Sequence, residues 1–206
     1  MSVYNTPFHL VKRAIDSVLK QTYQAFELIV VDDGSDMYLS EKILHYCQMQ
    51  EAKICYIKHS NCGQSQSINK AIKVSSGKYI AIIDSDDEYK PNHLYYCLQE
   101  METADLISSY TDTIVNIEDD YYVPDKDDNK KNIHVDDCIL FATLFGRREV
   151  FEKLAFKSMY AADAAFYESA AKDFTVKKVN LRTYIYYRNY ESSLSAKLKS
   201  AQVELQ

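Results

Sequence analysis

Short apolar runs alternate with amphipathic segments along the first hundred residues. Phe26–Val31 and Tyr79–Ile83 are mostly apolar and rich in β-branched residues, and Ile54–Lys58 is similar, which predicts three strands. Between them, apolar positions recur at helical spacing and predict helices that begin at Thr6-Pro7 (with Thr6 as the cap), span Leu39–Gln48 and Gln64–Val74, and run from Pro91 to about Met101. Strands that alternate with helices indicate an α/β protein with a mostly parallel sheet flanked by helices.

The second half of the chain is less regular. Glu118–Asp137 carries eight acidic residues without a sustained period, which predicts a long surface loop. The remaining pattern predicts strands at Leu106–Tyr110, Thr113–Ile117, Cys138–Phe145, Phe174–Val179 and Tyr184–Arg188, helices at Arg147–Leu154 and Ala161–Lys172, and a helical tail after Ser195.

The composition is that of a folded soluble domain. Apolar residues make up 47% and charged residues 26% of the 206 residues, and the net charge is −6, so we expect no nucleic-acid-binding surface, which would be basic. No apolar run approaches the roughly 20 residues that cross a bilayer, so we expect at most a peripheral association with membranes. The five cysteines and five histidines show no spacing of a metal site or disulfide framework, and we expect reduced thiols that mostly fill core positions.

An acidic loop follows the strand predicted at Tyr79–Ile83. Asp84 and Asp86 are two positions apart, so in extended backbone their side chains point the same way, with Cα atoms about 6.5 Å apart. Two such carboxylates can share one hard divalent cation and leave coordination positions open for phosphate oxygens. The alternative is a solvated acidic turn that caps the next helix.

Two further loops lie at element ends where ligands bind in parallel sheets. In Asp32-Asp33-Gly34-Ser35 a carboxylate can accept hydrogen bonds from a ribose or a base N–H, although such a sequence is also typical of a simple turn. Asn61-Cys62-Gly63-Gln64-Ser65 enters a helix whose free N–H groups favour anions, or Ser65 is only the helix cap.

Taken together in this order, the loops resemble those of family 2 glycosyltransferases, the inverting enzymes of the GT-A fold. The resemblance rests on these motifs: Val3-Tyr4-Asn5, Val30-Val31-Asp32-Asp33-Gly34-Ser35, Asn61-x-Gly63, Asn69, Gly77-Lys78-Tyr79-Ile80, Ile83-Asp84-Ser85-Asp86-Asp87, Pro91, and Tyr187-Arg188 with Ser193-Leu194-Ser195. It spans nearly the whole chain and is most specific in the first ninety residues. It implies a Rossmann-like GT-A fold as one domain over residues 1–206, in which residues 1–101 bind the nucleotide and residues 102–206 form an irregular acceptor-binding half.

The resemblance also implies roles for individual residues. Tyr4 is expected near the base, Asp33 with Asp32 at the uracil and ribose, Asp84 at the ribose, and Asp86, together with Asp84, on Mn²⁺ or Mg²⁺ at the diphosphate. The cation would neutralise the charge that develops on the leaving diphosphate. The remaining donor-site residues that the motifs imply are Asn61, Gly63, Asn69, Ser85 and Arg188.

A further acidic residue of the family deprotonates the acceptor hydroxyl. The matching stretch ends at Asp163, which is therefore the candidate base; the alternative is a helix-start carboxylate favoured by the helix dipole. Ala162 stands where the family has a second acid, Ile68 where many members have arginine, and Tyr190 where the closing motif has histidine.

The first strand of the family is nearly absent, because only Met1-Ser2-Val3 precedes Tyr4. Its loss is expected to leave backbone groups of the neighbouring strands unpaired. We therefore expect either a native start upstream of Met1 or a shortened and impaired family member.

The resulting hypothesis is metal-dependent, inverting transfer of a sugar from a nucleotide sugar, expected to be UDP-linked, to a glycan or lipid-linked glycan acceptor. The expected location is the cytoplasm or the inner face of the membrane. The alternative is a catalytically impaired nucleotide-sugar-binding or scaffold subunit. A nucleotidyltransferase is not supported, because the glycine-rich phosphate loop after the first strand is missing.

Overall fold

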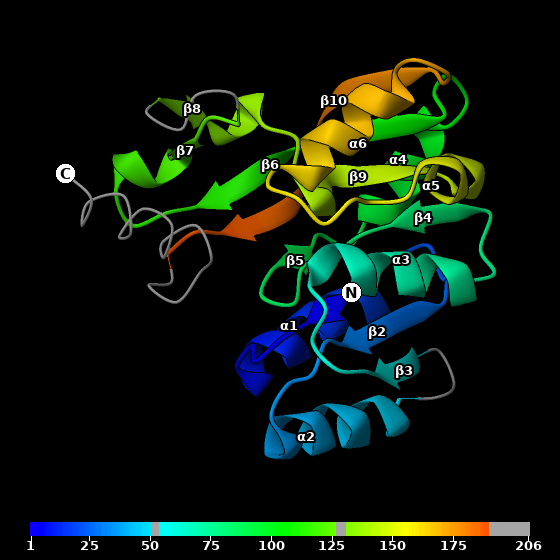
Figure 1. Ribbon diagram of the computed structural model, residues 1–206, viewed down its shortest axis with the longest axis vertical. Coiled ribbons are helices and arrows are strands. Elements are labelled where there is room, and N and C mark those ends of the chain that lie inside the picture. Colours follow the sequence, from blue (N-terminus) through cyan, green and yellow to red (C-terminus); the bar gives the residue numbers. More distant parts are fainter. Residues whose placement is uncertain (51–53, 127–130, 190–206) are drawn as a thin grey trace.

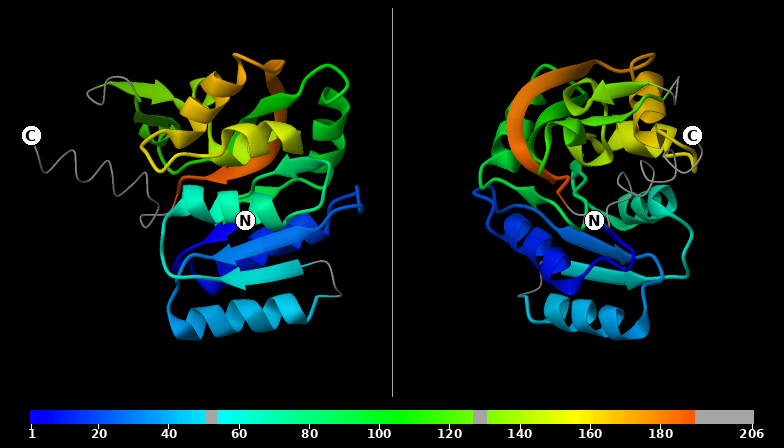
Figure 2. Two further views of the ribbon diagram at one scale, coloured as in Figure 1. Left: turned by 45° about the vertical axis from the view of Figure 1, so that its right-hand side comes forward. Right: turned by 90° about the vertical axis from the view of Figure 1, so that its left-hand side faces the viewer.

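The computed structural model describes residues 1–50, 54–126 and 131–189. Its first part is a parallel three-stranded sheet in the order β1 (Ser2–Val3), β2 (Leu28–Asp32) and β3 (Ile54–Lys58). The crossover helices are α1 (Phe8–Leu19), α2 (Met37–Gln48) and α3 (Gln64–Val74). α1 and α3 cover opposite faces of this sheet, and α2 packs beside β3 (Figures 1 and 2).

Local capping groups explain where these helices begin. α1 begins after Pro7, and the predicted cap by Thr6 is wrong because the Thr6 hydroxyl is bonded to Ser85 instead. α2 begins two residues earlier than predicted because the carboxylate of Asp36 accepts a hydrogen bond from the amide of Leu39. α3 has the predicted bounds, but its cap is Gly63, so Ser65 lies inside the helix.

A mixed sheet forms the second part of the fold. Its order is β4-β9-β6-β10-β5, with β6 and β10 parallel and the other neighbours antiparallel. The strands are β4 (Tyr79–Ala81), β5 (Glu88–Tyr89), β6 (Leu106–Ile114), β9 (Leu144–Arg147) and β10 (Val176–Tyr187), and the helices are α4 (His93–Glu100), α5 (Arg148–Leu154) and α6 (Ala162–Ala170). β10 curves strongly around the outside of the molecule (Figure 2, right).

Three predictions for the second half are wrong in detail. The two strands expected over residues 106–117 are the single strand β6, and those expected over 174–188 are the single strand β10, whose register shifts between Val179 and Tyr184. Cys138–Phe145 is not a strand: a 3₁₀ turn at Phe141–Thr143 leads into β9.

The acidic segment after residue 117 is also more ordered than expected. It contains 3₁₀ turns at Glu118–Tyr121 and Val135–Asp137, and a hairpin of β7 (Tyr122–Pro124) and β8 (Asn132–His134). Tyr190 and the tail, including Ser193 and Ser195, lie outside the described residues.

Two apolar clusters support the sheets. One joins α1, α2, α4, β2 and β6 around residues such as Ile15, Val30 and Ile107. The other lies among α3, α5 and α6 and includes Ile68 and Phe166. Ile68, at the position where the resemblance led us to consider arginine, is 4% exposed and belongs to the core.

The thiols contribute less to the core than expected. Cys47 and Cys97 are buried, but Cys55 and Cys62 are exposed and Cys138 is half-buried. In the described part of the chain, no helix is both long and apolar enough to cross a bilayer.

A slot lies between the two sheets, behind the two-residue strand β1. β1 pairs with β2 through Ser2 and Val3, and a single bridge joins Ser2 to Asp84. Behind Met1 is an apolar cavity of about 310 Å³, lined by Leu28 and Ile29 of the β2 side and by residues 79–83 on the other side. Among the described strands, β4 pairs with β9 only.

Candidate functional site

The loops at the carboxyl ends of β1, β2 and the β4 segment are tied to one another by hydrogen bonds. Asn5, which follows β1 and has a φ of 50°, donates from its amide to the Ser35 hydroxyl at 3.0 Å and accepts from the amide of Asp36 at 3.0 Å. The hydroxyls of Thr6 and Ser85 are 2.7 Å apart. The parallel topology therefore brings the predicted loops together, with the exposed Tyr4 at their rim.

Three carboxylates gather beside these loops. Burial, followed by the carboxylates of Asp86 and Asp163, raises the pKa of Asp84 to about 7. Burial also raises the pKa of Asp86, and that of Asp163 to about 6. Such a cluster is electrostatically unfavourable without a cation or protons, and its donor atoms are the oxygens that Mg²⁺ and Mn²⁺ prefer.

The start of α6 positions Asp163. Ala161 adopts the left-handed conformation with a φ of 51° and turns the chain into the helix. One Asp163 oxygen accepts from the amide of Phe141 at 3.1 Å and the other from its neighbour Ala164 at 2.9 Å. Ala162 is 3% exposed. Asp163 therefore lies in the first turn of α6, and its charge also acts on Asp84, so a helix-start role and a role in the site are compatible.

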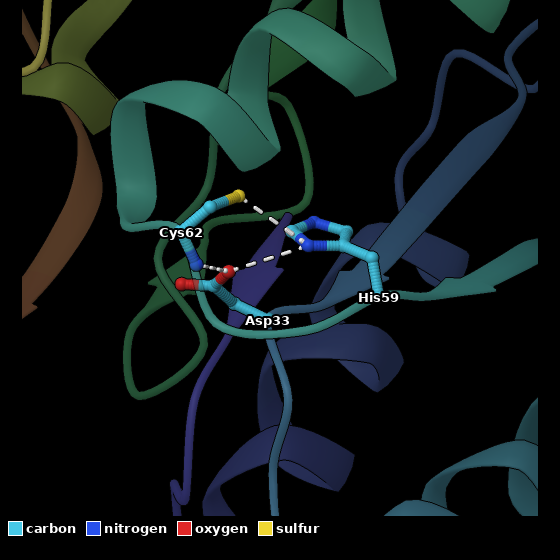
Figure 3. A group of neighbouring side chains, drawn as sticks. All are labelled: Asp33, His59 and Cys62. Atoms are coloured by element: carbon cyan, nitrogen blue, oxygen red, sulfur yellow. Dashed lines mark hydrogen bonds and ion pairs between the residues drawn. The ribbon is translucent and has the colours of Figure 1, made fainter.

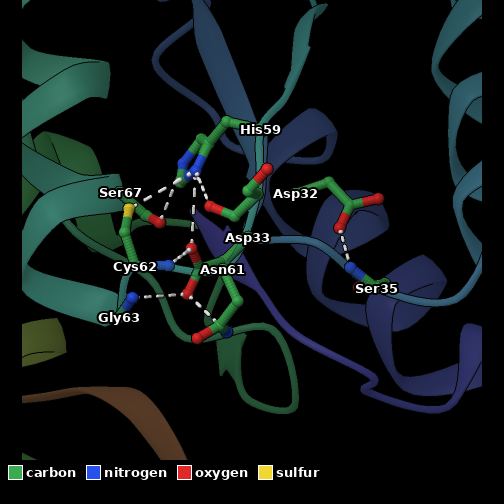
Figure 4. Close-up of polar contacts among 9 residues, drawn as sticks. Asp32, Asp33, Ser35, His59, Asn61, Cys62, Gly63 and Ser67 are labelled. Carbon is green, nitrogen blue, oxygen red and sulfur yellow. Dashed lines mark hydrogen bonds and ion pairs between the residues drawn. The ribbon is translucent and has the colours of Figure 1, made fainter.

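Asp33 organises the loop after β3 (Figure 4). One oxygen accepts from the amide of Cys62 at 2.8 Å, and the other from the amide of Gly63 at 2.9 Å and the side chain of Asn61 at 3.1 Å. Gly63 supports this arrangement with a φ of 93°. Three of the predicted donor-site residues therefore form one hydrogen-bonded unit.

Asp32 stabilises the turn after β2, whereas Asp33 contacts the neighbouring loop. It is fully buried, and its carboxylate accepts from the hydroxyls of Ser40 and Tyr56 and from the amide of Ser35. Although burial acts to raise it, these hydrogen bonds hold the pKa of Asp32 below its usual value. Successive side chains of a strand point to opposite faces, so Asp32 stabilises the turn while Asp33 reaches the neighbouring loop.

Asn69 and Arg188 lie on the supporting framework. Both amide atoms of Asn69 bond to the backbone of Phe156, at 2.7 and 2.8 Å, and so fix the segment that leads to α6. The guanidinium of Arg188 is buried and donates to the carbonyls of Asp120 and Tyr122. In this structure neither side chain is bonded to the residues around Asp84.

Several site residues were missed from the sequence. Gln64 donates to Asp84 at 2.8 Å. The buried carboxylate of Asp87 accepts from the Tyr184 hydroxyl and from the Tyr187 amide at 2.8 Å, which ties the acidic loop to the end of β10. Arg13 donates to the carbonyl of Asp86. The place of Gln64 in the first turn of α3 could have indicated its role. No sequence pattern indicated the contacts of Asp87 or Arg13, because their partners are distant in the sequence.

His59, for which the sequence spacing indicated no ligand role, lies close to two other potential metal ligands. Its Nδ1 is 3.5 Å from Asp33 and 3.4 Å from the Cys62 thiol, and Figure 3 shows the three side chains converging.

Curated proteins resemble this chain in sequence over about half of its length. A curated glycosyltransferase of Rickettsia bellii is 42% identical over 99 residues, which are 48% of this chain and 14% of that protein. The glycosyltransferase GlyG of Streptococcus pneumoniae is 39% identical over 112 residues, 52% of this chain and 36% of GlyG. The chain thus spans well under half the length of these curated relatives.

Solved structures share the fold at low sequence identity. TarS of S. aureus in complex with UDP has a TM-score of 0.70 at 16% identity, covering 90% of this chain and 58% of that chain. The mannosyltransferase PcManGT of Pyrobaculum calidifontis, in complex with GDP-Man and Mn²⁺, has a TM-score of 0.69 at 16% identity, covering 89% and 54%. The α/β architecture with its parallel sheet is thus that of GT-A glycosyltransferases, as predicted.

The sequence model described as "Glycosyl transferase family 2" matches residues 1–157. Because this match covers more than half of the chain, the protein belongs to glycosyl transferase family 2.

Proposed function

We propose that this chain transfers a glycosyl group from a nucleotide sugar to an acceptor hydroxyl, with inversion at the anomeric carbon. The observation that carries the proposal is the gathering of Asp84, Asp86 and Asp163 beside the Tyr4 and Asp33 loops. Structural neighbours were solved with UDP-GlcNAc and with GDP-Man and Mn²⁺, which supports a nucleotide sugar as the donor. We propose a UDP-linked donor and a glycan or lipid-linked glycan acceptor on the basis of family membership.

Asp86, with Asp84, would hold Mn²⁺ or Mg²⁺. The fit rests on the oxygen donor set and on the burial of both carboxyls, which raises their pKa values and makes their ionised forms unfavourable without a cation. When bound, the cation supplies electrostatic stabilisation of the leaving diphosphate.

The other steps belong to the side chains of this chain. Tyr4, more than half exposed at the rim, offers a ring on which a base can stack, and Asp33 offers a carboxylate for a base N–H. Asp163, with a pKa near 6, is ionised above that pH and accepts the proton of the acceptor hydroxyl. Asn69 bonds to the backbone of Phe156 and so helps to fix the chain that leads to α6 and Asp163.

Calorimetric titration with UDP tests the donor site. We expect binding that requires Mn²⁺ and weakens at least 100-fold in Asp86→Asn, because one charged ligand of the cation is lost. Glu41→Gln, a change of an exposed acid on α2, is the matched control and should bind as the wild type does. Cation-independent binding, or unchanged binding in Asp86→Asn, would contradict the assignment.

A second candidate, a binding subunit without turnover, is favoured by the buried Ala162, which stands where the family resemblance implies a second acid. Release of UDP from UDP-GlcNAc, measured with wild type and Asp163→Asn, separates the two. Turnover that falls at least 100-fold in Asp163→Asn while UDP affinity is retained supports the enzyme. Tight UDP binding with no turnover in either protein supports the binding subunit.

A further inference from the structure

A second set of potential metal ligands lies on the loop after β3. Asp33, His59 and Cys62 each offer one ligand atom, and these atoms all lie within 4.8 Å of one another (Figure 3). His59 Nδ1 is 3.5 Å from Asp33 Oδ1 and 3.4 Å from Cys62 Sγ. Ligand atoms of a tetrahedral zinc site are about 3.3–3.6 Å apart, given its usual bond lengths. The observed spacing therefore already approaches that of a metal site.

The imidazole ring is held from its opposite side. His59 Nε2 is 3.2 Å from the hydroxyl of Ser67, which is fully buried on α3 (Figure 4). Such a contact from the other ring nitrogen commonly orients a metal-binding histidine.

The surroundings of His59 Nδ1 are rich in electron pairs. Besides Asp33 Oδ1 and Cys62 Sγ, the carbonyl of Ser60 lies 2.7 Å from Nδ1. A single N–H on this nitrogen can donate a good hydrogen bond to only one of these three atoms. A cation in the same place can interact with several electron-pair donors at once.

The donor set indicates which cation suits the site. A carboxylate oxygen, an imidazole nitrogen and a sulfur are typical ligands of Zn²⁺, whereas Mg²⁺ and Mn²⁺ prefer oxygen alone. Cys62 is exposed, so solvent ions reach the site. Three protein ligands leave one coordination position for water, and the cation replaces the Cys62 thiol proton, which passes to solvent.

We propose that Asp33, His59 and Cys62 bind a thiophilic divalent cation of the Zn²⁺ class, and that this cation competes with the nucleotide for Asp33. The competition rests on the proposed function, but the cation site does not. The Asp33 oxygen that bonds to the cation cannot also accept a base N–H, so the site would make donor binding sensitive to zinc.

Cobalt(II) titration of the metal-free, reduced protein tests the site, because a thiolate bound to Co²⁺ gives a near-ultraviolet charge-transfer band. We expect one equivalent of Co²⁺ to produce the band and Zn²⁺ to remove it. Cys62→Ser should abolish the band, and His59→Gln should weaken Co²⁺ binding at least tenfold. Cys55→Ser, which removes another exposed thiol, is the matched control and should keep the band, as should Asp86→Asn. Circular dichroism and thermal unfolding establish that each variant is folded.

The proposal is overturned if the wild type gives no band, if Cys62→Ser keeps it, or if Cys55→Ser loses it. Competition is then measured as the Kd of UDP with Mg²⁺ present. At Zn²⁺ ten times above its own Kd, the Kd of UDP should rise about tenfold in the wild type and stay unchanged in Cys62→Ser. A cobalt band with no effect of Zn²⁺ on UDP binding would refute the competition. Failure of UDP to bind without Zn²⁺ would refute the proposed donor site while leaving the cobalt result intact.

Discussion

The slot behind Met1 should accept an additional strand. Continuing the register Ser2–Val31 and Ser2–Asp84 backwards from Met1 places five added residues opposite residues 25–29, which include the start of β2, and opposite residues 78–82, which include β4. The cavity lining includes residues from both faces of the sheet, such as Val18 on one side and Ile68 on the other. Such a strand is covered on both faces, so an extension of the sequence Ile-Val-Ile-Val-Ile, placed directly before Met1, matches it.

The expected gain follows from the size of the cavity. Filling a cavity of about 310 Å³ at about 24 cal/mol per Å³ would raise the free energy of unfolding by at most about 7 kcal/mol. Because this slot is open to solvent, we expect roughly half of that gain. About eight new ladder hydrogen bonds add about 1 kcal/mol each, and ordering five residues costs about 1–2 kcal/mol per residue. The net stabilisation is about 3 kcal/mol, which corresponds to a rise in Tm of about 6–12 °C for a chain of this size.

Thermal and urea unfolding of the extended protein and of two control extensions of equal length would measure this stabilisation. Gly-Ser-Gly-Ser-Gly controls for length and for loss of the Met1 charge, whose amine now bonds to the Ile29 carbonyl at 3.0 Å. Ile-Val-Pro-Val-Ile controls for added hydrophobicity, because proline cannot donate within a central strand. If the apolar extension is no more stable than both controls, the cavity is not a strand site and the reasoning fails.

Two further predictions concern charge and backbone in the site. Asp84→Asn should gain stability relative to the wild type as the pH rises from 4 to 7. The folded pKa of Asp84, about 7, exceeds the unfolded value of about 3.9. Between these two pH values the unfolded chain releases the Asp84 proton more readily than the folded protein does, so the wild type loses stability as the pH rises. Urea unfolding of the metal-free proteins should show a difference that grows to about 4 kcal/mol at pH 7.5; a difference that does not change with pH would show that the pKa is not raised. Gly34→Ala should cost about 1–3 kcal/mol, because φ is 85° and the new Cβ would lie 2.6 Å from the Asn61 nitrogen. Gly63→Ala meets no atom within 4 Å and should cost less in the same assay; equal losses would refute the steric explanation.

The first half of the fold was readable because its signals are local. β3 and α3 have the predicted bounds, since a short β-branched run and a 3.6-residue period each fix an element without help from distant residues. The segment 138–145 was misread because an apolar stretch without a period is ambiguous. Its conformation depends on contacts such as that between the Phe141 amide and Asp163.

The same distinction applies to the candidate site. Parallel topology was enough to place the Asp33, Asn61 and Asp84 loops together. The sequence did not show which of two adjacent aspartates faces the neighbouring loop, because that depends on which face of β2 is covered. It was also silent on the link from Asn69 to Phe156, which are 87 positions apart.

The hydrogen bonds of Asp33 limit how it can meet a ligand. A carboxylate has about four acceptor positions, and three are used by the amides of Cys62 and Gly63 and by the side chain of Asn61. One position remains, facing the approach of His59 at 3.5 Å. A base N–H and a cation bound to His59 and Cys62 must therefore compete for the same lone pair, so the loop that prepares the site for a nucleotide also makes it sensitive to a thiophilic metal.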